Sequence, residues 1–135
     1  METKRQNWPQ RPRIHYSAPK GWMNDPNGLI YHDGYYHLYY QHFPNDCVHG
    51  PMHWGHARSQ DLIHWEDLPI ALYPDENGMI YSGSVVPVLL EGKPALAAIY
   101  TCHKDEGSGQ YREAQAIAYS TDGGISFTKY KDNPV

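Results

Sequence analysis

Short runs rich in Tyr, Val, Ile and Leu alternate with Gly, Pro, Asn and Asp along this 135-residue chain. No segment keeps a 3.6-residue apolar period long enough for a helix, so the pattern is that of strands joined by turns. The segment His103–Gln110, which contains Gly-Ser-Gly, is expected to be an exposed and flexible loop. We predict an all-β chain with eight strands, near residues 28–32, 35–41, 53–59, 63–68, 81–89, 95–101, 114–120 and 126–130.

An internal repeat groups these strands into two sets of four. Two segments share an Ala, a Ser, an Asp and a following aromatic residue, and they lie 61 residues apart: Ala57-Arg-Ser59-Gln-Asp61 with Trp65, and Ala118-Tyr-Ser120-Thr-Asp122 with Phe127. Four strands per copy is the composition of a propeller blade. A plain β-sandwich is the alternative fold.

Two blades do not make a complete propeller. About four or more blades are needed to close the ring, so two would leave one sheet face uncovered. We therefore expect a truncated propeller, with a lead-in arm at 1–20 and a partial propeller domain at 21–135, whose blades lie near 23–70 and 80–133. The missing carboxy-terminal part of the same protein is the partner that this arrangement requires.

The charge distribution argues against several classes of protein. The net charge is −4, and residues 1–20 hold five basic groups and one acidic group, so a short basic arm precedes an acidic body. Nucleic-acid binding needs a broad positive face, so we expect no nucleic-acid partner and a solvated arm. No run approaches the roughly 18 apolar residues of a membrane span, and no apolar region of a secretory signal follows the start, so we expect neither feature.

The cysteines and histidines give weaker signals. Two cysteines, Cys47 and Cys102, are too few for a disulfide scaffold, which predicts a cytoplasmic protein and leaves their pairing open. Three histidines could suggest a metal site, but their spacing has geometric meaning only on a helix, which the intervening Gly-Pro opposes: His49, His53 and His56. A serine hydrolase would need a Gly-x-Ser-x-Gly segment, which the sequence lacks.

The segment Gly21–Gly28 carries the clearest chemistry. Its Asp-Pro-Asn-Gly portion, read alone, predicts a β-turn. The same residues also make a good mount for a reactive carboxylate, because Pro26 pushes Asp25 into an extended conformation before any substrate arrives. Asn24 and Trp22 flank Asp25 with an amide and a flat apolar face, the two kinds of group that a sugar ring binds.

This segment resembles the signature of a known family. Trp22-Met-Asn-Asp-Pro-Asn-Gly28 is similar to the signature of family 32 of the glycoside hydrolases, which includes invertases, sucrose-6-phosphate hydrolases and fructan hydrolases. The similarity continues in order along the chain, through Arg11-Pro12 with His15-Tyr16, Tyr39-Tyr40-Gln41, Trp54-Gly-His-Ala57 to Asp61-Leu62 with His64-Trp65, and Tyr81-Ser82-Gly83-Ser84. Five blocks in order make a chance match improbable.

The resemblance implies a fold and a mechanism. The family fold is a five-bladed β-propeller followed by a β-sandwich, and this chain would supply about the first two blades. Asp25 would be the catalytic nucleophile, which forms a covalent fructosyl-enzyme in a retaining reaction on β-fructofuranosides such as sucrose or sucrose 6-phosphate. We expect no cofactor and no metal. The small-molecule sugar would be bound by Trp22, Asn24, Gln41, Tyr81 and Ser82.

Two departures limit the resemblance. A retaining glycosidase needs a second carboxylate as acid/base, and the family places this residue in a Glu-Cys motif and a transition-state-stabilising Asp in an Arg-Asp-Pro motif; the sequence contains neither motif. The isolated chain is therefore expected to be inactive. Where many relatives carry Trp before a Gly, this sequence has His49-Gly50, and Val48-His49-Gly50 is similar to the segment of sucrose-6-phosphate hydrolases at this position. The phosphate of such a substrate could be bound by Arg11, Arg13 or Lys20. A fructan hydrolase and a non-catalytic sugar-binding propeller fragment remain the alternatives.

Overall fold

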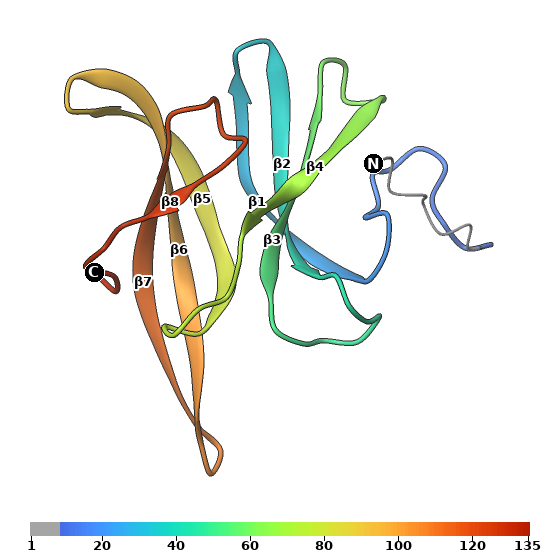
Figure 1. Ribbon diagram of the computed structural model, residues 1–135. Helices are drawn as coiled ribbons and strands as arrows, with labels where there is room; N and C mark the ends of the chain where they lie inside the picture. The colour runs from blue at the N-terminus through green and yellow to red at the C-terminus, as the bar shows by residue number, and fades with distance from the viewer. Residues whose placement is uncertain (1–8) are drawn as a thin grey trace.

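The computed structural model describes residues 9–135, which form eight strands in two four-stranded antiparallel sheets and no helix. The first sheet consists, in order, of β1 (Trp22–His32), β2 (Tyr35–Phe43), β3 (His53–Ser59) and β4 (Trp65–Leu72). The second consists of β5 (Met79–Leu90), β6 (Lys93–Gly107), β7 (Gln110–Ser120) and β8 (Thr128–Lys129). Figure 1 shows the two sheets side by side, with β1 next to β5.

The eight predicted strands are all present, and the two sheets are the two copies of the repeat. Strands adjacent in sequence are also adjacent in each sheet, as in a propeller blade and unlike the Greek-key order of a sandwich. The repeated Ser-x-Asp segments follow the third strand of each sheet. Ser59 Oγ donates to Asp61 Oδ1 at 3.1 Å, and Ser120 Oγ donates to Asp122 Oδ1 at 2.7 Å. The predicted all-β fold of two four-stranded blades is confirmed.

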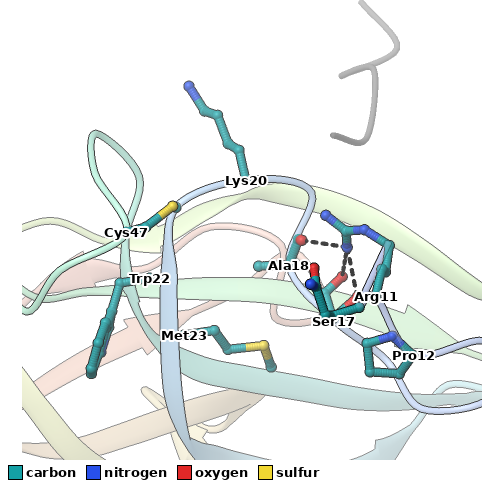
Figure 2. A pocket seen from close by; sticks show the side chains of 10 residues that line it. Arg11, Pro12, Ser17, Ala18, Lys20, Trp22, Met23 and Cys47 are labelled. Carbon is teal, nitrogen blue, oxygen red and sulfur yellow. Dashed lines mark hydrogen bonds between the residues drawn. The ribbon is translucent and has the colours of Figure 1, made fainter. Parts of the chain in front are cut away.

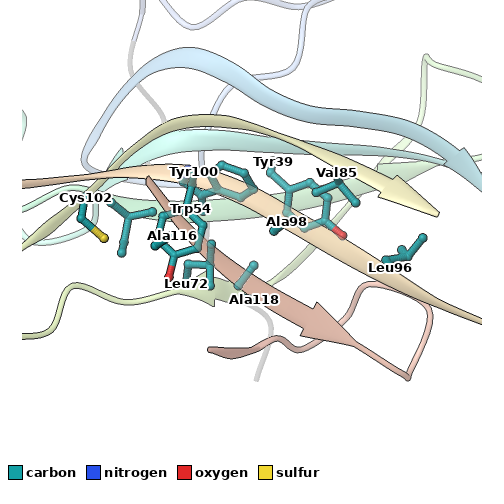
Figure 3. Close-up of a cluster of buried hydrophobic side chains, with 12 residues drawn as sticks. Tyr39, Trp54, Leu72, Val85, Leu96, Ala98, Tyr100, Cys102, Ala116 and Ala118 are labelled. Carbon is teal, nitrogen blue, oxygen red and sulfur yellow. The ribbon is translucent and has the colours of Figure 1, made fainter. Parts of the chain in front are cut away.

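The main apolar core lies between the two sheets (Figure 3). Tyr39, Trp54 and Leu72 of the first sheet share this core with Tyr100 and with smaller side chains of the second sheet, Val85, Leu96, Ala98, Ala116 and Ala118. The rings of Trp54 and Tyr100 meet edge-on at 6.0 Å between centroids, and both are buried. Large rings from both sheets thus pack among small side chains of the second sheet, which gives the dense packing of a protein interior.

A glycine permits the close approach of β1 to β5. Gly28 has a φ of +52°, a conformation that side chains disfavour. A Cβ atom at this position would lie 2.6 Å from Cγ2 of Val85 and 2.7 Å from Cδ2 of Tyr39. The two sheets can therefore pack at this distance only if residue 28 has no side chain.

The structure corrects two local predictions. The Asp-Pro-Asn-Gly portion is not a β-turn, because β1 begins at Trp22 and runs through it with two irregularities in its pairing to β2. The expected loop His103–Gln110 is mostly strand as well, since β6 continues to Gly107 and β7 starts at Gln110. Ser108 and Gly109 have φ angles of 54° and 75°, as the two central residues of a tight type I′ hairpin require.

The arm is also different from the expectation, because its described part is not simply solvated. Ala18 is buried, and Tyr16 packs against the first sheet, where its hydroxyl lies 3.0 Å from that of Tyr40 and donates to Asp67 Oδ1 at 2.8 Å. Arg11 turns back along the arm and donates to the carbonyls of Ser17, Ala18 and Pro19. The basic residues Lys4 and Arg5 lie outside the described residues.

Candidate active site

Asp25 lies near the start of β1, at an irregularity of the sheet. Met23 pairs with His42 and Pro26 pairs with Tyr40, so Asn24 and Asp25 share one partner position on β2. Such a bulge changes the direction of side chains and is common next to active sites. The side chains of Asn24 and Asp25 are both exposed as a result.

A hydrogen bond joins Asp25 to the second sheet. Ser82 Oγ donates to Asp25 Oδ2 at 2.9 Å. Within residues 9–135, no hydrogen bond reaches the other carboxylate oxygen, Oδ1. One oxygen is thus held in place by the protein, while the other is free to approach a ligand.

Asp25 and Ser82 occupy equivalent positions in their sheets. Each is the fourth residue of the first strand of its sheet, β1 or β5. The bulge of β1 between Met23 and Pro26 has its counterpart in β5, where the register shifts between Ile80 and Gly83. The two bulges therefore bring one side chain from each blade to the same point.

Trp22 and Asn24 form the next part of the site. Trp22 Nε1 donates to Asn24 Oδ1 at 2.7 Å, and the ring of His49 meets the Trp22 ring edge-on at 6.2 Å between centroids. The backbone carbonyl of Trp22 lies 2.8 Å from Nδ1 of His42, whose pKa is lowered by burial, so the neutral ring donates its Nδ1 proton. These contacts fix the indole and the amide beside Asp25.

Gln41 lies below this exposed surface. Its side chain is 2 % exposed, and its Nε2 donates to the carbonyl of Ile80 at 2.9 Å. The Oε1 atom accepts from Nδ2 of Asn27 at 2.8 Å, an orientation that follows because Gln41 Nε2 is already used by Ile80. The amide of Gln41 thus links the two sheets beneath Asp25, and its predicted contact with a sugar hydroxyl stays a prediction.

Asn27 is a residue of the site that the sequence analysis did not single out. It is 2 % exposed and pairs with Gln41 from the same bulged part of β1. The sequence gives no signal for its burial, which depends on the packing of β1. Once Asn27 is buried, its amide requires a partner, and Gln41 supplies it. Asn27 is a support for the site and has no exposed surface for a ligand.

Tyr81 directs its ring along the second sheet. The ring stacks on His103 at 4.4 Å with an interplanar angle of 12°, and burial raises the pKa of the Tyr81 hydroxyl. Its backbone carbonyl accepts from Trp54 Nε1 at 3.0 Å. Although Tyr81 directly precedes Ser82 in the chain, its ring packs against His103 of β6, whereas Ser82 contacts Asp25.

The arm forms a separate cavity of about 340 Å³ (Figure 2). It is lined by the arm together with Trp22, Met23 and Cys47, and it does not include Asp25 or Ser82. Figure 2 shows Arg11 directed at Ser17 and Ala18, with Lys20 pointing away from them. The guanidinium of Arg11 is thus occupied by the arm itself, and Lys20 is the exposed cation at this cavity.

The other groups considered from the sequence lie apart. His53 Nδ1 lies 2.8 Å from the carbonyl of Pro51, while His56 Nε2 lies 2.9 Å from Nδ1 of His37. The described part of the chain contains no cluster of three His, Cys, Asp or Glu side chains suited to a metal ion. Cys47 and Cys102 are both unpaired, so the open question of their pairing is answered, and the cytoplasmic location stays a prediction. Residues 9–135 include no helix long and apolar enough to cross a membrane.

Known proteins are similar to this chain in sequence. A levanase of Bacillus subtilis is 51% identical over 132 residues, which cover 93% of this chain and 19% of the levanase. An invertase of Schizosaccharomyces pombe is 45% identical over 144 residues, which cover 96% of this chain and 24% of the invertase. The chain thus spans about a fifth to a quarter of the length of these relatives.

Solved structures agree with the sequence relatives. A GH32 β-fructofuranosidase of Bombyx mori superposes with a TM-score of 0.81 at 47% identity, over 92% of this chain and 26% of that protein. An exo-inulinase of Aspergillus awamori gives 0.80 at 41% identity, over 96% and 29%. The two sheets correspond to the first two blades of the five-bladed propeller of these enzymes. Residues 15–135 match the N-terminal domain of glycosyl hydrolase family 32, and the chain belongs to this family.

Proposed function

We propose that this chain supplies the nucleophile of a retaining β-fructofuranosidase, and that the nucleophile is Asp25. The observation that carries this proposal is the state of the Asp25 carboxylate, which is exposed, held through Oδ2 by Ser82 and free at Oδ1. A covalent mechanism needs a carboxylate that is fixed in direction and accessible to the sugar.

We propose a role for each neighbouring group. Asp25 Oδ1 attacks the anomeric carbon of the fructosyl unit and forms an ester, while the bond to the leaving sugar breaks. Water then attacks the same carbon and releases fructose, which restores the carboxylate. Asn24 and Ser82 are exposed polar groups beside the reacting oxygen, and Trp22 offers a fixed flat face for the ring.

The leaving sugar also requires a proton. General acid catalysis contributes about 10² to 10⁴ in rate, and the acid of a retaining glycosidase lies about 5–5.5 Å from the nucleophile. We propose that this second carboxylate belongs to the remainder of the enzyme, because the relatives are four to five times longer than the matched segment. The 135-residue chain alone would then release no fructose.

Of the three cations considered for a phosphate contact, Arg13 and Lys20 are exposed, and Arg11 is engaged by its own arm. Arg11, a candidate for a phosphate contact, uses its guanidinium on the carbonyls of its own arm. The relatives reported above are a levanase and an invertase, and these names indicate a fructan and sucrose as their substrates. We therefore propose sucrose or a fructan as substrate in preference to sucrose 6-phosphate.

The test is to complete the enzyme. The 135-residue chain is mixed with the separately produced carboxy-terminal part of the Bacillus subtilis levanase, and fructose release from sucrose and levan is measured. Acid quenching during turnover, followed by mass spectrometry, should show a fructosyl adduct on the peptide that contains Asp25. Asp25→Asn should remove the adduct and lower the rate by several orders of magnitude, whereas the exposed control Asp46→Asn should not.

Two results would contradict this proposal. Retention of more than about a tenth of the rate by Asp25→Asn would mean that another residue is the nucleophile. Sugar binding by the completed protein without any turnover would instead support the alternative of a non-catalytic sugar-binding propeller.

A further inference from the structure

Three aromatic rings form a continuous stack across the second sheet, starting at the candidate site. Tyr81 of β5 stacks on His103 of β6 at 4.4 Å, and His103 stacks on Tyr111 of β7 at 5.0 Å with an interplanar angle of 28°. Tyr81 directly precedes Ser82, which binds Asp25. The stack therefore runs from the residue that precedes Ser82 to the outer hairpin.

The hairpin that carries Tyr111 extends beyond the body of the blade. The β6–β7 ladder is regular from Leu96↔Ser120 to Asp105↔Tyr111, and Figure 1 shows its end projecting past the other strands. Met79, near the start of β5, pairs with His103, so the start of β5 and the hairpin lie at the same end of the sheet. This is also the end at which Ser82 meets Asp25.

Polar contacts hold the stack in position. His103 Nδ1 lies 3.0 Å from Glu113 Oε1, which fixes the plane of the imidazole between the two tyrosines. Gln115 Nε2 donates to Thr101 Oγ1 at 3.0 Å, between directly paired positions of the same two strands. His103 is largely covered by its neighbours, whereas Tyr111 is 65 % exposed, so the stack ends in a ring that is open to a ligand.

We propose that Tyr81, His103 and Tyr111 form a binding wall for the sugar units on the leaving-group side of a fructan chain. This inference rests on the proposed function and deepens it, because it assigns the acceptor of the longer substrate to named residues. Fixed aromatic rings with polar edges match a sugar, which has apolar C–H faces and hydroxyl edges.

The experiment measures substrate-length preference in the completed enzyme. The ratio of kcat/KM for a fructo-oligosaccharide of five units to kcat/KM for sucrose is compared between the unchanged protein and Tyr111→Ala. We expect this ratio to fall by roughly fivefold to tenfold, chiefly through KM, because a lost aromatic platform weakens binding more than chemistry. Tyr111→Phe, which keeps the ring, should retain most of the preference.

A matched control is available on the first sheet. Tyr31 is 61 % exposed and its ring contacts that of Tyr36 at 4.7 Å between centroids with an interplanar angle of 48°, but it lies near the opposite end of β1 from Asp25. Tyr31→Ala should leave the ratio unchanged. An unchanged ratio in Tyr111→Ala, or equal losses on sucrose and on the oligosaccharide, would overturn the proposed wall.

Failure of the two proposals can be distinguished. If the completed, unchanged protein releases no fructose from any substrate, the proposed function fails, and the wall is tested by binding alone. The 135-residue chain is then titrated with the same oligosaccharide and followed by nuclear magnetic resonance. Shifts at Tyr111 and His103 that disappear in Tyr111→Ala support the wall, and their absence from the unchanged chain overturns it.

Discussion

The hydroxyl of Ser82 lies 2.9 Å from the carboxylate of Asp25, although the two residues are 57 positions apart and belong to different sheets. The candidate nucleophile is thus oriented by a contact from the neighbouring blade as well as by the bulge of its own strand. The contact makes the chemistry of Asp25 depend on how the two blades pack.

Ser82→Ala is expected to lower kcat/KM of the completed enzyme by roughly tenfold to hundredfold, because a hydrogen bond to a charged group contributes about 1.5–3 kcal/mol. Steady-state kinetics on sucrose would measure this loss. Ser84→Ala is the control, since Ser84 is exposed on the same strand. Equal rates for Ser82→Ala and the unchanged enzyme would show that Asp25 needs no partner from β5.

Gly28→Ala is expected to destabilise the chain by about 2–4 kcal/mol, because the new Cβ would collide with Val85 and Tyr39 in addition to the strain of a positive φ. Gly34→Ala provides a matched control: its φ is +83°, but no atom lies within 4 Å of the new Cβ. This second change should cost only about 1–2 kcal/mol. Urea unfolding followed by tryptophan fluorescence compares the two, and equal costs would argue against close packing at residue 28.

Stability is expected to fall as the pH drops below about 6.5. Burial lowers the pKa of His56 to about 3, with smaller contributions from His37 and Arg58, and burial also lowers the pKa of His37. The unfolded chain binds protons from about pH 6.5 downward while the folded chain does not, so acid favours unfolding. His56 alone should account for about 2 kcal/mol between pH 7 and pH 5.

Urea midpoints at pH 7 and pH 5 test this titration. His56→Gln should reduce the difference between the two midpoints, whereas His15→Gln, at an exposed position, should leave the difference in place. The buried residues His42 and His53, whose pKa values are also lowered by burial, supply a remaining part of the effect. A His56→Gln variant with the full pH dependence would assign the effect to other groups.

Gln41→Ala separates a structural role from a role in sugar binding. The change leaves the Ile80 carbonyl and the Asn27 amide without their partner, so we expect a loss of about 1–3 kcal/mol in unfolding free energy. Asn24→Ala, at an exposed position, should instead raise KM and leave the stability within about 0.5 kcal/mol. An unchanged stability for Gln41→Ala would show that the buried amides contribute little to the blade interface.

The sequence predicted the strands and their grouping because both depend on local pattern. The short apolar runs between turn residues and the 61-residue repeat are visible in the chain itself, and the sheets follow them. The start of β1 was not predictable from turn propensity, since Asp-Pro-Asn-Gly lies in a strand once β2 supplies partners for its bulge. The hairpin turn at Ser108–Gly109 was predicted as a longer loop because a Gly-Ser-Gly segment is compatible with both, and only the strand pairing around it distinguishes them.

The structure shows where the predicted site residues lie. Asn24, Asp25 and Ser82 are exposed, and Asp25 and Ser82 are in contact, while the roles that the resemblance implied for them stay predictions. The position of Gln41 could not be derived, because burial depends on how β2 meets β5 and not on the amide itself. The same limit hid Asn27 and the stacked rings of His103 and Tyr111, whose partners are distant in sequence.

The equivalent bulges of β1 and β5 have a consequence for protein engineering. The fourth residue of each first strand occupies an equivalent backbone position, which carries the carboxylate of Asp25 in the first sheet and the hydroxyl of Ser82 in the second. Substitutions at residues 25 and 82 could therefore introduce new pairs of functional groups, because the fold places these two positions in contact.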